Sequence, residues 1–434
     1  MARRYLIVGT GGAGVAAAEA IQNHDPGGHI LLIGDEPHGF YSRPGLAYLL
    51  TGEVPERQLF LSQARSFQQL NARAVKLNPQ AHQLTLDNGD THTYDRLLIA
   101  TGSSAVMPAI PGIDLAGMVK LDNLDDARHI LKLARRGKSA VVIGGGITAL
   151  EIVEGLVTRG VKTHYLMRGN RYWRNVLDET ESSIVEQRLR KKGVQLHYGA
   201  HITEIEGKKA RIEAIHTNTG QRLKCNIVAI AVGVRPRLSL AQTADLRIDR
   251  GILTDEYLQT SAADVFAAGD VAQVFDPLTN AAGLDTLWGV AVTQGRTAGQ
   301  NMVGGRVPYQ KRIPFNVTRL ADLTTTLIGM VGHGSDDDLL SIARGDSETW
   351  RYQPDGMAAQ TTFEVNRLRL VIGPQTILGA VVMGDQTLSQ PLHHLITHQV
   401  DISAVRDQLL APHALLPEIV TKFWTTWRQT HATP

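Results

Sequence analysis

The N-terminal part of the chain alternates short apolar runs with one longer helical segment. Residues 5–8 and 30–33 are apolar, and the alanine-rich segment 13–24 between them has the length and composition of a helix. A strand, a helix and a second strand in this order form a βαβ unit, which is typical of a parallel sheet. The pattern therefore predicts an α/β fold at the start of the chain.

The same order returns after a charged segment, 122–138, which we expect to be helical. An apolar run at 140–143 leads into an expected helix at 147–159 and a further strand at 162–167. The chain thus contains a second βαβ unit, which we interpret as a second domain of the same class.

Beyond about residue 305 the pattern changes to short β-rich runs separated by Gly, Pro and Asp. These runs are 324–331, 361–365, 368–372 and 377–383. We interpret this part as a third, α+β domain.

The chain ends with an apolar stripe at helical spacing. Its members are Leu416, Ile419, Val420, Phe423, Trp424 and Trp427. Burying six such side chains gains on the order of 9–18 kcal/mol, so the stripe must be covered. The third domain itself, a second subunit in a homodimer, or a shallow membrane contact could cover it, and membrane attachment is the least expected of the three.

Each of the two βαβ units contains a glycine-rich turn between its first strand and its helix. The turns read Gly9-Thr10-Gly11-Gly12-Ala13-Gly14 and Gly144-Gly145-Gly146-Ile147-Thr148-Ala149. In such a turn the first glycine allows the bend, the second lets backbone N–H groups approach a pyrophosphate, and the third packs helix on strand. The helix N-terminus adds its dipole and its unsatisfied N–H groups. Two such turns indicate two dinucleotides bound by one chain.

Composition and charge exclude several classes of protein. The chain has 434 residues, enough for two or three domains, and 44 basic against 42 acidic residues. Without a basic patch, a nucleic-acid partner is not expected. Residues 1–8 could pass for the start of a secretory signal, but glycines interrupt its apolar core, and no apolar run approaches the roughly 18 residues that span a bilayer. We expect a cytoplasmic protein.

The chain contains one cysteine, Cys225. A single cysteine excludes an internal disulfide, a CxxC redox pair, a cysteine-ligated iron–sulfur cluster and a multi-cysteine zinc site. His393, His394 and His398 invite a metal hypothesis, but no nearby carboxylate or cysteine completes a ligand set, so we interpret them as ordinary polar histidines and expect no metal.

In combination the motifs resemble the FAD-dependent pyridine nucleotide oxidoreductases with two dinucleotide-binding domains. Members of that family include ferredoxin, rubredoxin and nitrite reductase flavoproteins, apoptosis-inducing factor and coenzyme A-disulfide reductase. Besides the two glycine turns, the matching motifs are Asp35-Glu36-Pro37, Tyr41-Ser42-Arg43-Pro44, Ala100-Thr101-Gly102, Ala231-Val232-Gly233-Val234-Arg235-Pro236 and Ala268-Gly269-Asp270. The resemblance implies two Rossmann-like domains and a C-terminal α+β domain. The implied boundaries are 1–110 and 240–310 for FAD, 111–239 for NAD(P)H and 311–434 for the third domain.

The resemblance also implies roles for individual residues. Asp35 or Glu36 would accept hydrogen bonds from the ribose hydroxyls of the FAD adenosine. Asp270 would hold the ribitol, and Trp288 would lie along the pyrimidine edge of the flavin. Arg43 would lie near the pyrophosphate and flavin. The implied cofactor-binding set is Gly9, Gly11, Gly12, Ala13, Gly14, Asp35, Glu36, Arg43, Val75, Ala100, Thr101, Gly102, Gly144, Gly146, Ile147, Thr148, Arg168, Arg174, Gly233, Gly269, Asp270 and Trp288.

The route of the electrons follows from two departures from the family pattern. Members that reduce disulfides or peroxides carry a reactive cysteine beside the flavin, and this chain has Pro44 at that position. Ferredoxin-reductase-like members carry a lysine near the flavin that pairs with a glutamate, and here Tyr48 replaces the lysine while Glu151 matches the glutamate. Tyr48 and Glu151 are therefore the expected catalytic pair, which orients the nicotinamide.

The cofactor preference is inferred from the end of the strand at 162–167. The chain reads Tyr165-Leu166-Met167-Arg168 there and lacks the acidic residue that NADH binders usually have. Arg168 and Arg174 resemble an arginine pair that binds the 2′-phosphate of NADPH, although both could be a solvated basic face. NADPH is therefore slightly favoured.

The expected function is hydride transfer from NAD(P)H to FAD, with electrons passed to a small redox protein of ferredoxin or rubredoxin type. The alternatives are a quinone, dioxygen or another small-molecule acceptor, or a redox-sensing protein with low turnover.

Overall fold

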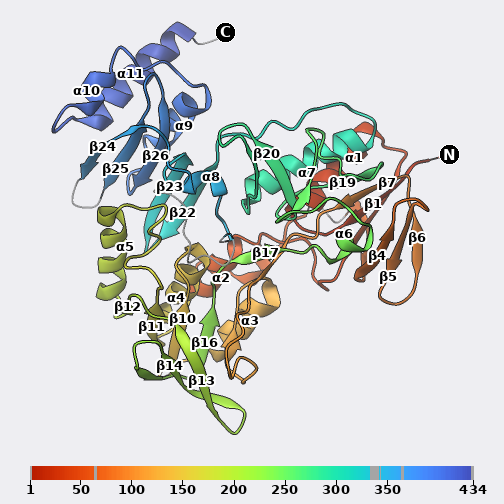
Figure 1. Cartoon of the computed structure of the whole chain (residues 1–434), viewed down its shortest axis with the longest axis horizontal. Helices are drawn as coiled ribbons and strands as arrows, with labels where there is room; N and C mark the ends of the chain where they lie inside the picture. Colours follow the sequence, from red (N-terminus) through yellow and green to blue (C-terminus); the bar gives the residue numbers. More distant parts are fainter. Residues whose placement is uncertain (1, 63–65, 333–341, 343, 363–365, 432–434) are drawn as a thin grey trace. The chain divides into compact units, whose positions relative to one another are not determined.

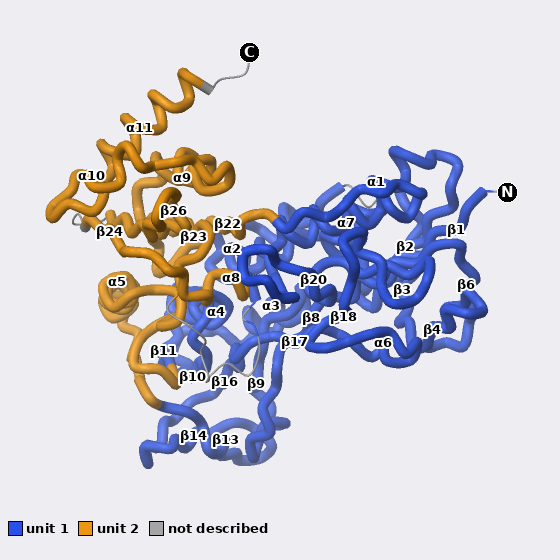
Figure 2. The backbone as a smooth tube through the Cα atoms, turned by 45° about the horizontal axis from the view of Figure 1, so that its top comes forward, with its two compact units in different colours: residues 1–166, 200–311, 339–346 blue, residues 167–199, 312–338, 347–434 orange. Residues whose placement is uncertain are grey.

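The computed structural model describes residues 2–62, 66–332, 342, 344–362 and 366–431. The chain forms two compact units, shown in blue and orange in Figure 2. The first unit comprises residues 1–166, 200–311 and 339–346, and the second comprises residues 167–199, 312–338 and 347–434.

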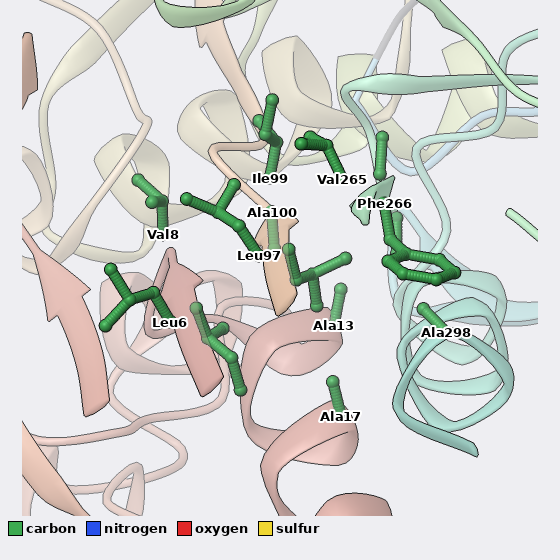
Figure 3. Packing of buried hydrophobic residues seen from close by; sticks show 14 of the residues in the cluster. Leu6, Val8, Ala13, Ala17, Leu97, Ile99, Ala100, Val265, Phe266 and Ala298 are labelled. Atoms are coloured by element: carbon green, nitrogen blue, oxygen red, sulfur yellow. The ribbon is translucent and has the colours of Figure 1, made fainter. Parts of the chain in front are cut away.

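The first unit contains a five-stranded parallel sheet in the order β19-β7-β1-β2-β3. Figure 1 labels its strands β1, β7 and β19. Its strands are β1 (Arg4–Val8), β2 (His29–Gly34), β3 (Gln68–Asn71), β7 (Arg96–Ile99) and β19 (Val265–Ala267). The central strands are buried on both faces, as expected for parallel strands covered by helices. Figure 3 shows part of this core, with Leu6, Leu97 and Val265 among its members.

Two helices that pack against this core lie unusually close together. They are α1 (Gly12–His24) and α7 (Trp288–Met302). A Cβ at Gly295 would lie 2.0 Å from the Ala13 carbonyl oxygen, and one at Gly299 would lie 2.5 Å from that of Ala17. Because only glycine leaves room for this approach, α7 is held against the first two turns of α1.

A second parallel sheet in the same unit has the order β11-β10-β16-β9. Its strands are β9 (Met118–Val119), β10 (Ser139–Ile143), β11 (Lys162–Leu166) and β16 (Ile227–Ile230), and its helices are α3 (Leu124–Leu133) and α4 (Ile147–Thr158). Both predicted βαβ units are therefore present, with bounds within about two residues of those expected. The charged segment 122–138 is helical over only part of its length.

Small sheets, most of them antiparallel, short helices and a 3₁₀ turn complete the first unit. They are α2 (Gly45–Thr51), the turn Glu56–Gln58, β4 (Ala74–Asn78), β5 (Gln83–Leu86), β6 (Thr91–Thr93), β8 (Ser103–Ala105), β13 (Ile202–Lys208), β14 (Arg211–Thr217), β15 (Arg222–Lys224), β17 (Val234–Pro236), α6 (Ser239–Thr243), β18 (Ile252–Leu253), β20 (Ala272–Asp276) and β21 (Ala281–Gly283).

The second unit is built on an antiparallel sheet in the order β22-β23-β26-β25-β24. Its elements are α5 (Glu179–Lys191), β12 (Gln195–His197), β22 (Phe315–Leu320), β23 (Leu323–Gly329), α8 (Glu348–Arg351), β24 (Met357–Thr362), β25 (Arg367–Ile372), β26 (Ile377–Met383), α9 (Ser389–Thr397), α10 (Arg406–Leu410) and α11 (Leu416–His431). The strand expected at 361–365 is shifted toward the N-terminus, and residues 363–365 lie outside the described residues. The α/β fold class, including the α+β C-terminal part, is confirmed.

The C-terminal stripe forms one face of α11 and packs on the sheet of its own unit. Leu416 and Val420 are fully buried in the core of the second unit, and the other four stripe residues are partly buried against the same core. The intramolecular cover thus exists, and a homodimer or membrane contact is not needed to bury this face. Among the described residues, no helix is long and apolar enough to cross a membrane.

Candidate functional site

The two glycine turns have the same backbone geometry. Gly9 has φ +127° and Gly144 has φ +145°, values that L side chains rarely adopt. A Cβ at Gly9 would lie 2.1 Å from the carbonyl oxygen of Ala100, and a Cβ at Gly144 would lie 2.1 Å from that of Ala231. Each turn therefore presses directly against the end of the neighbouring parallel strand, which only glycine permits.

Both turns lead into a helix whose first N–H groups are open to a ligand. The N-cap residues are Gly11 for α1 and Gly146 for α4, and among the described residues no side chain caps either helix. By contrast, the Asn123 side chain caps α3 and Asp178 caps α5. No atom of the described residues lies within 4 Å of a Cβ built on Gly11. The uncapped N–H groups and the open space beside Gly11 fit the pyrophosphate of a dinucleotide.

The third position of each turn packs helix on strand, as its residue type predicts. A Cβ at Gly14 would lie 1.9 Å from the Gly9 carbonyl oxygen, so α1 requires glycine there. In the second turn the buried Ala149 takes this place. The next residues, Gly12 and Ala13 in the first turn and Ile147 and Thr148 in the second, form the first turns of α1 and α4.

Asp270 lies beside the first glycine turn. The preceding Gly269 has φ +79°, and a Cβ on it would lie 3.1 Å from the Ala13 Cβ. The Gly269 N–H donates to the buried side-chain oxygen of Gln294 on α7 at 2.8 Å, and Ser103 Oγ donates to Asp270 Oδ2 at 2.6 Å. The residues that follow β19 thus contact the start of α1 and the segment after β7. The sequence predicts that the ribitol of the flavin binds here.

The adjoining strand end carries the Ala100-Thr101-Gly102 motif. Gly102 has φ +67°, and Thr101 Oγ1 donates to the carbonyl oxygen of Arg237 at 3.1 Å. Gly233, with φ +120°, precedes β17, which pairs with β8.

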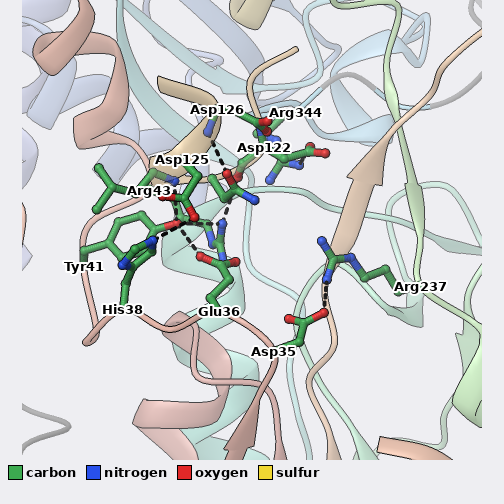
Figure 4. Close-up of polar contacts among 12 residues, drawn as sticks. Asp35, Glu36, His38, Tyr41, Arg43, Asp122, Asp125, Asp126, Arg237 and Arg344 are labelled. Atoms are coloured by element: carbon green, nitrogen blue, oxygen red, sulfur yellow. Dashed lines mark hydrogen bonds and ion pairs between the residues drawn. The ribbon is translucent and has the colours of Figure 1, made fainter. Parts of the chain in front are cut away.

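Of the two acidic residues after β2, Glu36 is committed to protein contacts (Figure 4). It forms an ion pair with Arg43 and accepts from the Tyr41 hydroxyl at 2.7 Å. Burial raises the pKa of Tyr41, so its hydroxyl stays protonated. Asp35, with its side chain 48% exposed, forms a 3.5 Å ion pair with Arg237. Asp35 is therefore the more accessible partner for a ribose.

Asp122 joins a buried polar network that sequence reasoning missed. Its carboxylate is 4% exposed and pairs with Lys120 Nζ at 2.8 Å and Arg344 Nη2 at 2.6 Å, while the Ala105 N–H donates to it. Its backbone oxygen accepts from Arg43 Nη1 at 2.8 Å. Burial by itself would raise the pKa of Asp122, but the two cations and the amide hold that pKa below its usual value.

The short segment that carries Arg344 lies next to the residues before α7. Gly345 N donates to the Thr286 carbonyl oxygen at 3.1 Å, and Thr286 N donates to that of Asp346 at 3.0 Å. Asp346 is fully buried. No sequence motif indicates this contact, since the partners are about sixty residues apart.

The predicted catalytic pair lies on two packed helices. Tyr48 is on α2 and is 37% exposed, and Glu151 is partly buried on α4. A Cβ at Gly155 on α4 would lie 2.7 Å from the Leu50 Cβ, and Arg159 Nε donates to the Leu50 carbonyl oxygen at 3.1 Å. The helices are therefore in contact, and a hydrogen bond between Tyr48 and Glu151 stays a prediction.

Trp288 and Val75 also lie in the first unit. Trp288 begins α7, stacks on Phe40 with ring centroids 5.8 Å apart, and comes within 3.5 Å of a Cβ built on Gly12. It thus lies at the open end of α1. Val75 is 40% exposed on β4. Their contacts with a flavin nucleotide stay predictions.

Arg168 and Arg174 belong to the second unit, in the loop before α5. Arg168 is exposed and Arg174 is partly buried. A Cβ on Gly169 would lie 2.9 Å from Arg174 Cδ. The Arg174 side chain therefore lies across the backbone of Gly169, the residue that follows Arg168, and joint binding of a phosphate by the two arginines stays a prediction.

Cys225 has no features of a redox thiol. It is 2% exposed, and burial raises its pKa to about 12, so the reactive thiolate is absent at neutral pH.

The three C-terminal histidines have aromatic rings as neighbours. His393 packs on Phe315 with ring centroids 4.5 Å apart, and His394 lies 4.2 Å from His398 and 5.0 Å from Trp427. Within the described part of the chain, no group of three or more His, Cys, Asp or Glu side chains could hold a metal.

Comparison with known proteins decides the family. The profile of the pyridine nucleotide-disulphide oxidoreductases matches residues 3–295. The chain belongs to this family. The family is FAD-dependent and uses NAD(P)H, so the chain is an NAD(P)H-dependent oxidoreductase, and its two glycine turns are the features that fit these two dinucleotides.

Individual relatives extend over most of the chain. The NADH-dependent phenylglyoxylate dehydrogenase subunit epsilon of Aromatoleum evansii is 27% identical over 432 residues, which cover 97% of this chain and 98% of the relative. The ferredoxin–NAD(+) reductase component of the biphenyl dioxygenase system of Paraburkholderia xenovorans is 34% identical over 272 residues. The alignment covers 61% of this chain and 66% of that relative. The solved putidaredoxin reductase in its covalent complex with putidaredoxin has a TM-score of 0.84 at 22% identity, covers 97% of this chain and 98% of its own, and supports the fold alone.

Proposed function

We propose that this chain transfers hydride from NADPH to bound FAD and passes the electrons to a small redox protein of the ferredoxin or rubredoxin type. The observation that carries the proposal is the pair of glycine turns with uncapped helix N-termini in a chain whose one cysteine is buried. When bound, FAD would accept two electrons together and release them singly. Because the chain offers no thiol relay, the acceptor must approach the flavin itself.

Residues of the first unit have complementary roles in this proposal. The N-terminus of α1 holds the pyrophosphate of FAD and Asp270 holds its ribitol, while α4 holds the pyrophosphate of the nicotinamide dinucleotide. Glu151, steadied by Tyr48, orients the nicotinamide. Orientation matters because the reacting atoms must lie about 3–3.5 Å apart, and small misplacements cost on the order of a hundredfold in rate.

The preference for NADPH rests on Arg168 and Arg174. Their loop lacks an acidic residue at the strand end, and the Arg174 side chain lies across Gly169 beside Arg168. Each charge-assisted contact to a phosphate contributes about 1.5–3 kcal/mol, so replacing both arginines should raise the KM for NADPH about a hundredfold or more. Equal efficiency with NADH and NADPH in the unmodified protein would contradict this preference.

A second candidate function is that of an electron-exchanging subunit in a larger enzyme. The relative from Aromatoleum evansii, aligned over 97% of this chain, is named as a subunit of an NADH-dependent dehydrogenase. In that role the chain would exchange electrons between a partner subunit and the nicotinamide dinucleotide, with the same two sites.

Anaerobic stopped-flow reduction with NADH and NADPH separately tests the proposal. The reduced protein is then mixed with ferredoxin, rubredoxin, a quinone or dioxygen. Rapid reduction by NADPH and rapid reoxidation by a small redox protein support the main function. Fast reoxidation only by quinone or dioxygen would show that one of these, and not a small redox protein, is the acceptor. A reduced complex that persists with every acceptor would indicate a redox sensor. The solution mass of the protein checks whether it forms a homodimer.

A further inference from the structure

The loop that carries Arg168 and Arg174 is tied to buried charges on two other elements of its unit. Arg369 on β25 is 3% exposed and Glu181 on α5 is fully buried. Arg369 Nε and Nη2 donate to the two carboxylate oxygens of Glu181 at 2.8 and 3.1 Å. Nη2 also donates to the Val176 carbonyl oxygen at 2.9 Å, and Nη1 donates to that of Val331 at 3.0 Å. One guanidinium therefore joins the end of the loop, α5 and the antiparallel sheet.

A second arginine on the same face of β25 balances the charge. Arg367, two residues before Arg369, forms an ion pair with Asp178 and lies 3.6 Å from Glu181. Asp178 and Glu181 also form the capping box of α5, in which each side chain accepts from the backbone N–H of the other residue. The two arginines thus bind the N-terminus of α5 directly after the loop.

The middle of the loop is fixed as well. Tyr172 donates its backbone N–H to Glu186 Oε1 at 2.8 Å, and its carbonyl oxygen accepts from Ser182 Oγ at 2.7 Å. Trp173 has φ +49° although its ring is 3% exposed and contacts Trp350 edge-on. A bulky residue in the left-handed region is strained and persists only where its surroundings over-determine it, as in ligand clamps.

Stability alone does not explain such a network. A fully buried ion pair is often no more stabilising than apolar side chains of similar volume, because both ions lose their hydration. Its bidentate geometry does, however, define one backbone arrangement. The backbone arrangement that this ion pair defines is that of the loop 168–177, which carries the exposed Arg168 and the partly buried Arg174.

We propose that Arg369 and Glu181 are positioning residues that hold residues 168–177 in the conformation in which Arg168 and Arg174 bind the 2′-phosphate of NADPH. This inference rests on the proposed preference for NADPH. Both side chains are buried and act on the loop, so removing the pair should weaken recognition of the phosphate without removing a group that faces the ligand.

The test is calorimetric binding of 2′,5′-ADP and of 5′-ADP to the FAD-loaded enzyme. Arg369→Met should weaken 2′,5′-ADP about tenfold or more and 5′-ADP less than twofold. The double variant Glu181→Gln/Arg369→Met leaves no buried charge uncompensated at this pair and should show the same loss. It therefore provides the test should the single variant fail to fold. In both variants the KM for NADPH rises more than kcat falls, the flavin content stays unchanged, and amides of residues 168–177 exchange faster with deuterium.

The matched control is Lys192→Met. Lys192 follows the other end of α5 and forms an ion pair with Asp322 in the turn between β22 and β23. This variant removes a charge pair between the same helix and the same sheet but should leave 2′,5′-ADP affinity unchanged. If the double variant binds 2′,5′-ADP like the unmodified enzyme, the inference is overturned and the preference for NADPH stands. If the unmodified enzyme binds 2′,5′-ADP no better than 5′-ADP, the preference for NADPH is overturned, and the inference with it.

Discussion

Replacing Gly11 separates cofactor binding from folding. Gly11 has φ −86°, which any residue adopts, and a Cβ built on it meets no atom of the described residues within 4 Å. The protein itself can therefore accommodate the Cβ of valine at this position. A bound pyrophosphate could not, because the valine side chain would occupy the space through which the phosphates reach the N–H groups of α1.

The size of the effect follows from the hydrogen bonds that the phosphates can no longer accept. A charge-assisted hydrogen bond contributes about 1.5–3 kcal/mol, so removing two N–H donors from the phosphates costs about 3–6 kcal/mol. The dissociation constant for FAD should rise about a hundred- to ten-thousandfold. The apoprotein should be destabilised by only about 1 kcal/mol, the difference between glycine and an apolar residue at an N-cap, which lowers Tm by about 2–4 °C.

The assay compares flavin content, FAD titration of the apoprotein and thermal unfolding of the apoprotein. Gly146→Val, at the N-cap of α4, is the matched control and should retain FAD while weakening NAD(P)H binding. Gly9→Ala is the opposite control. Its Cβ would lie 2.1 Å from the Ala100 carbonyl oxygen at φ +127°, so the apoprotein itself should be destabilised by more than about 3 kcal/mol.

Two results would refute the reasoning. A Gly11→Val protein with full flavin occupancy and an unchanged dissociation constant would show that the pyrophosphate does not approach α1. A Gly11→Val apoprotein as unstable as Gly9→Ala would show that the space beside Gly11 is not open.

The remaining predictions concern the reaction and the buried network. Cys225→Ser should leave flavin reduction and acceptor reduction intact in rapid mixing, and loss of acceptor reduction alone would reveal a thiol relay. Glu151→Gln should slow flavin reduction more than it weakens NAD(P)H binding, with a smaller effect of the same kind for Tyr48→Phe; an effect on KM alone would contradict the orienting role. Asp122→Asn should cost about 3 kcal/mol at neutral pH, because Arg344 loses its buried counter-ion. Since the pKa of Asp122 is lowered in the folded protein, its contribution is present above its unfolded pKa and is lost as the pH falls through the folded pKa. Denaturant titrations from about pH 5 to pH 3 should therefore show the unmodified protein losing stability faster than Asp122→Asn, and parallel losses would contradict this assignment.

The parts of the fold that the sequence predicted well depend on local rules. Both βαβ units, the strand Ile377–Met383 and the C-terminal helix follow from hydrophobic periodicity, and the glycine turns follow from their spacing. Gly9 and Gly144 show why the spacing is informative: each is required by a backbone contact that no other residue permits.

The parts that the sequence could not predict depend on contacts between distant segments. Asp122 and Arg344 are 222 residues apart, and neither belongs to a motif. Within the expected cofactor set, the commitment of Glu36 to Arg43 and Tyr41 was also not visible, because an acidic strand end is compatible with a ribose or with a protein partner. Only the three-dimensional arrangement shows which of Asp35 and Glu36 is accessible.

The C-terminal domain carries no motif from which a role could be inferred, and the role proposed for it above rests on its contacts. Residues 167–199, which hold both candidate phosphate-binding arginines, belong to the same compact unit as the C-terminal sheet. The link is chemical as well as spatial, since Arg367 and Arg369 of that sheet bind the carboxylates that cap α5. In our proposal, a domain that contributes no glycine turn thus influences the choice between NADPH and NADH, because it holds the loop that carries Arg168 and Arg174. Substitutions in β25 should consequently change the ratio of NADPH to NADH efficiency even though the strand lies outside both dinucleotide motifs.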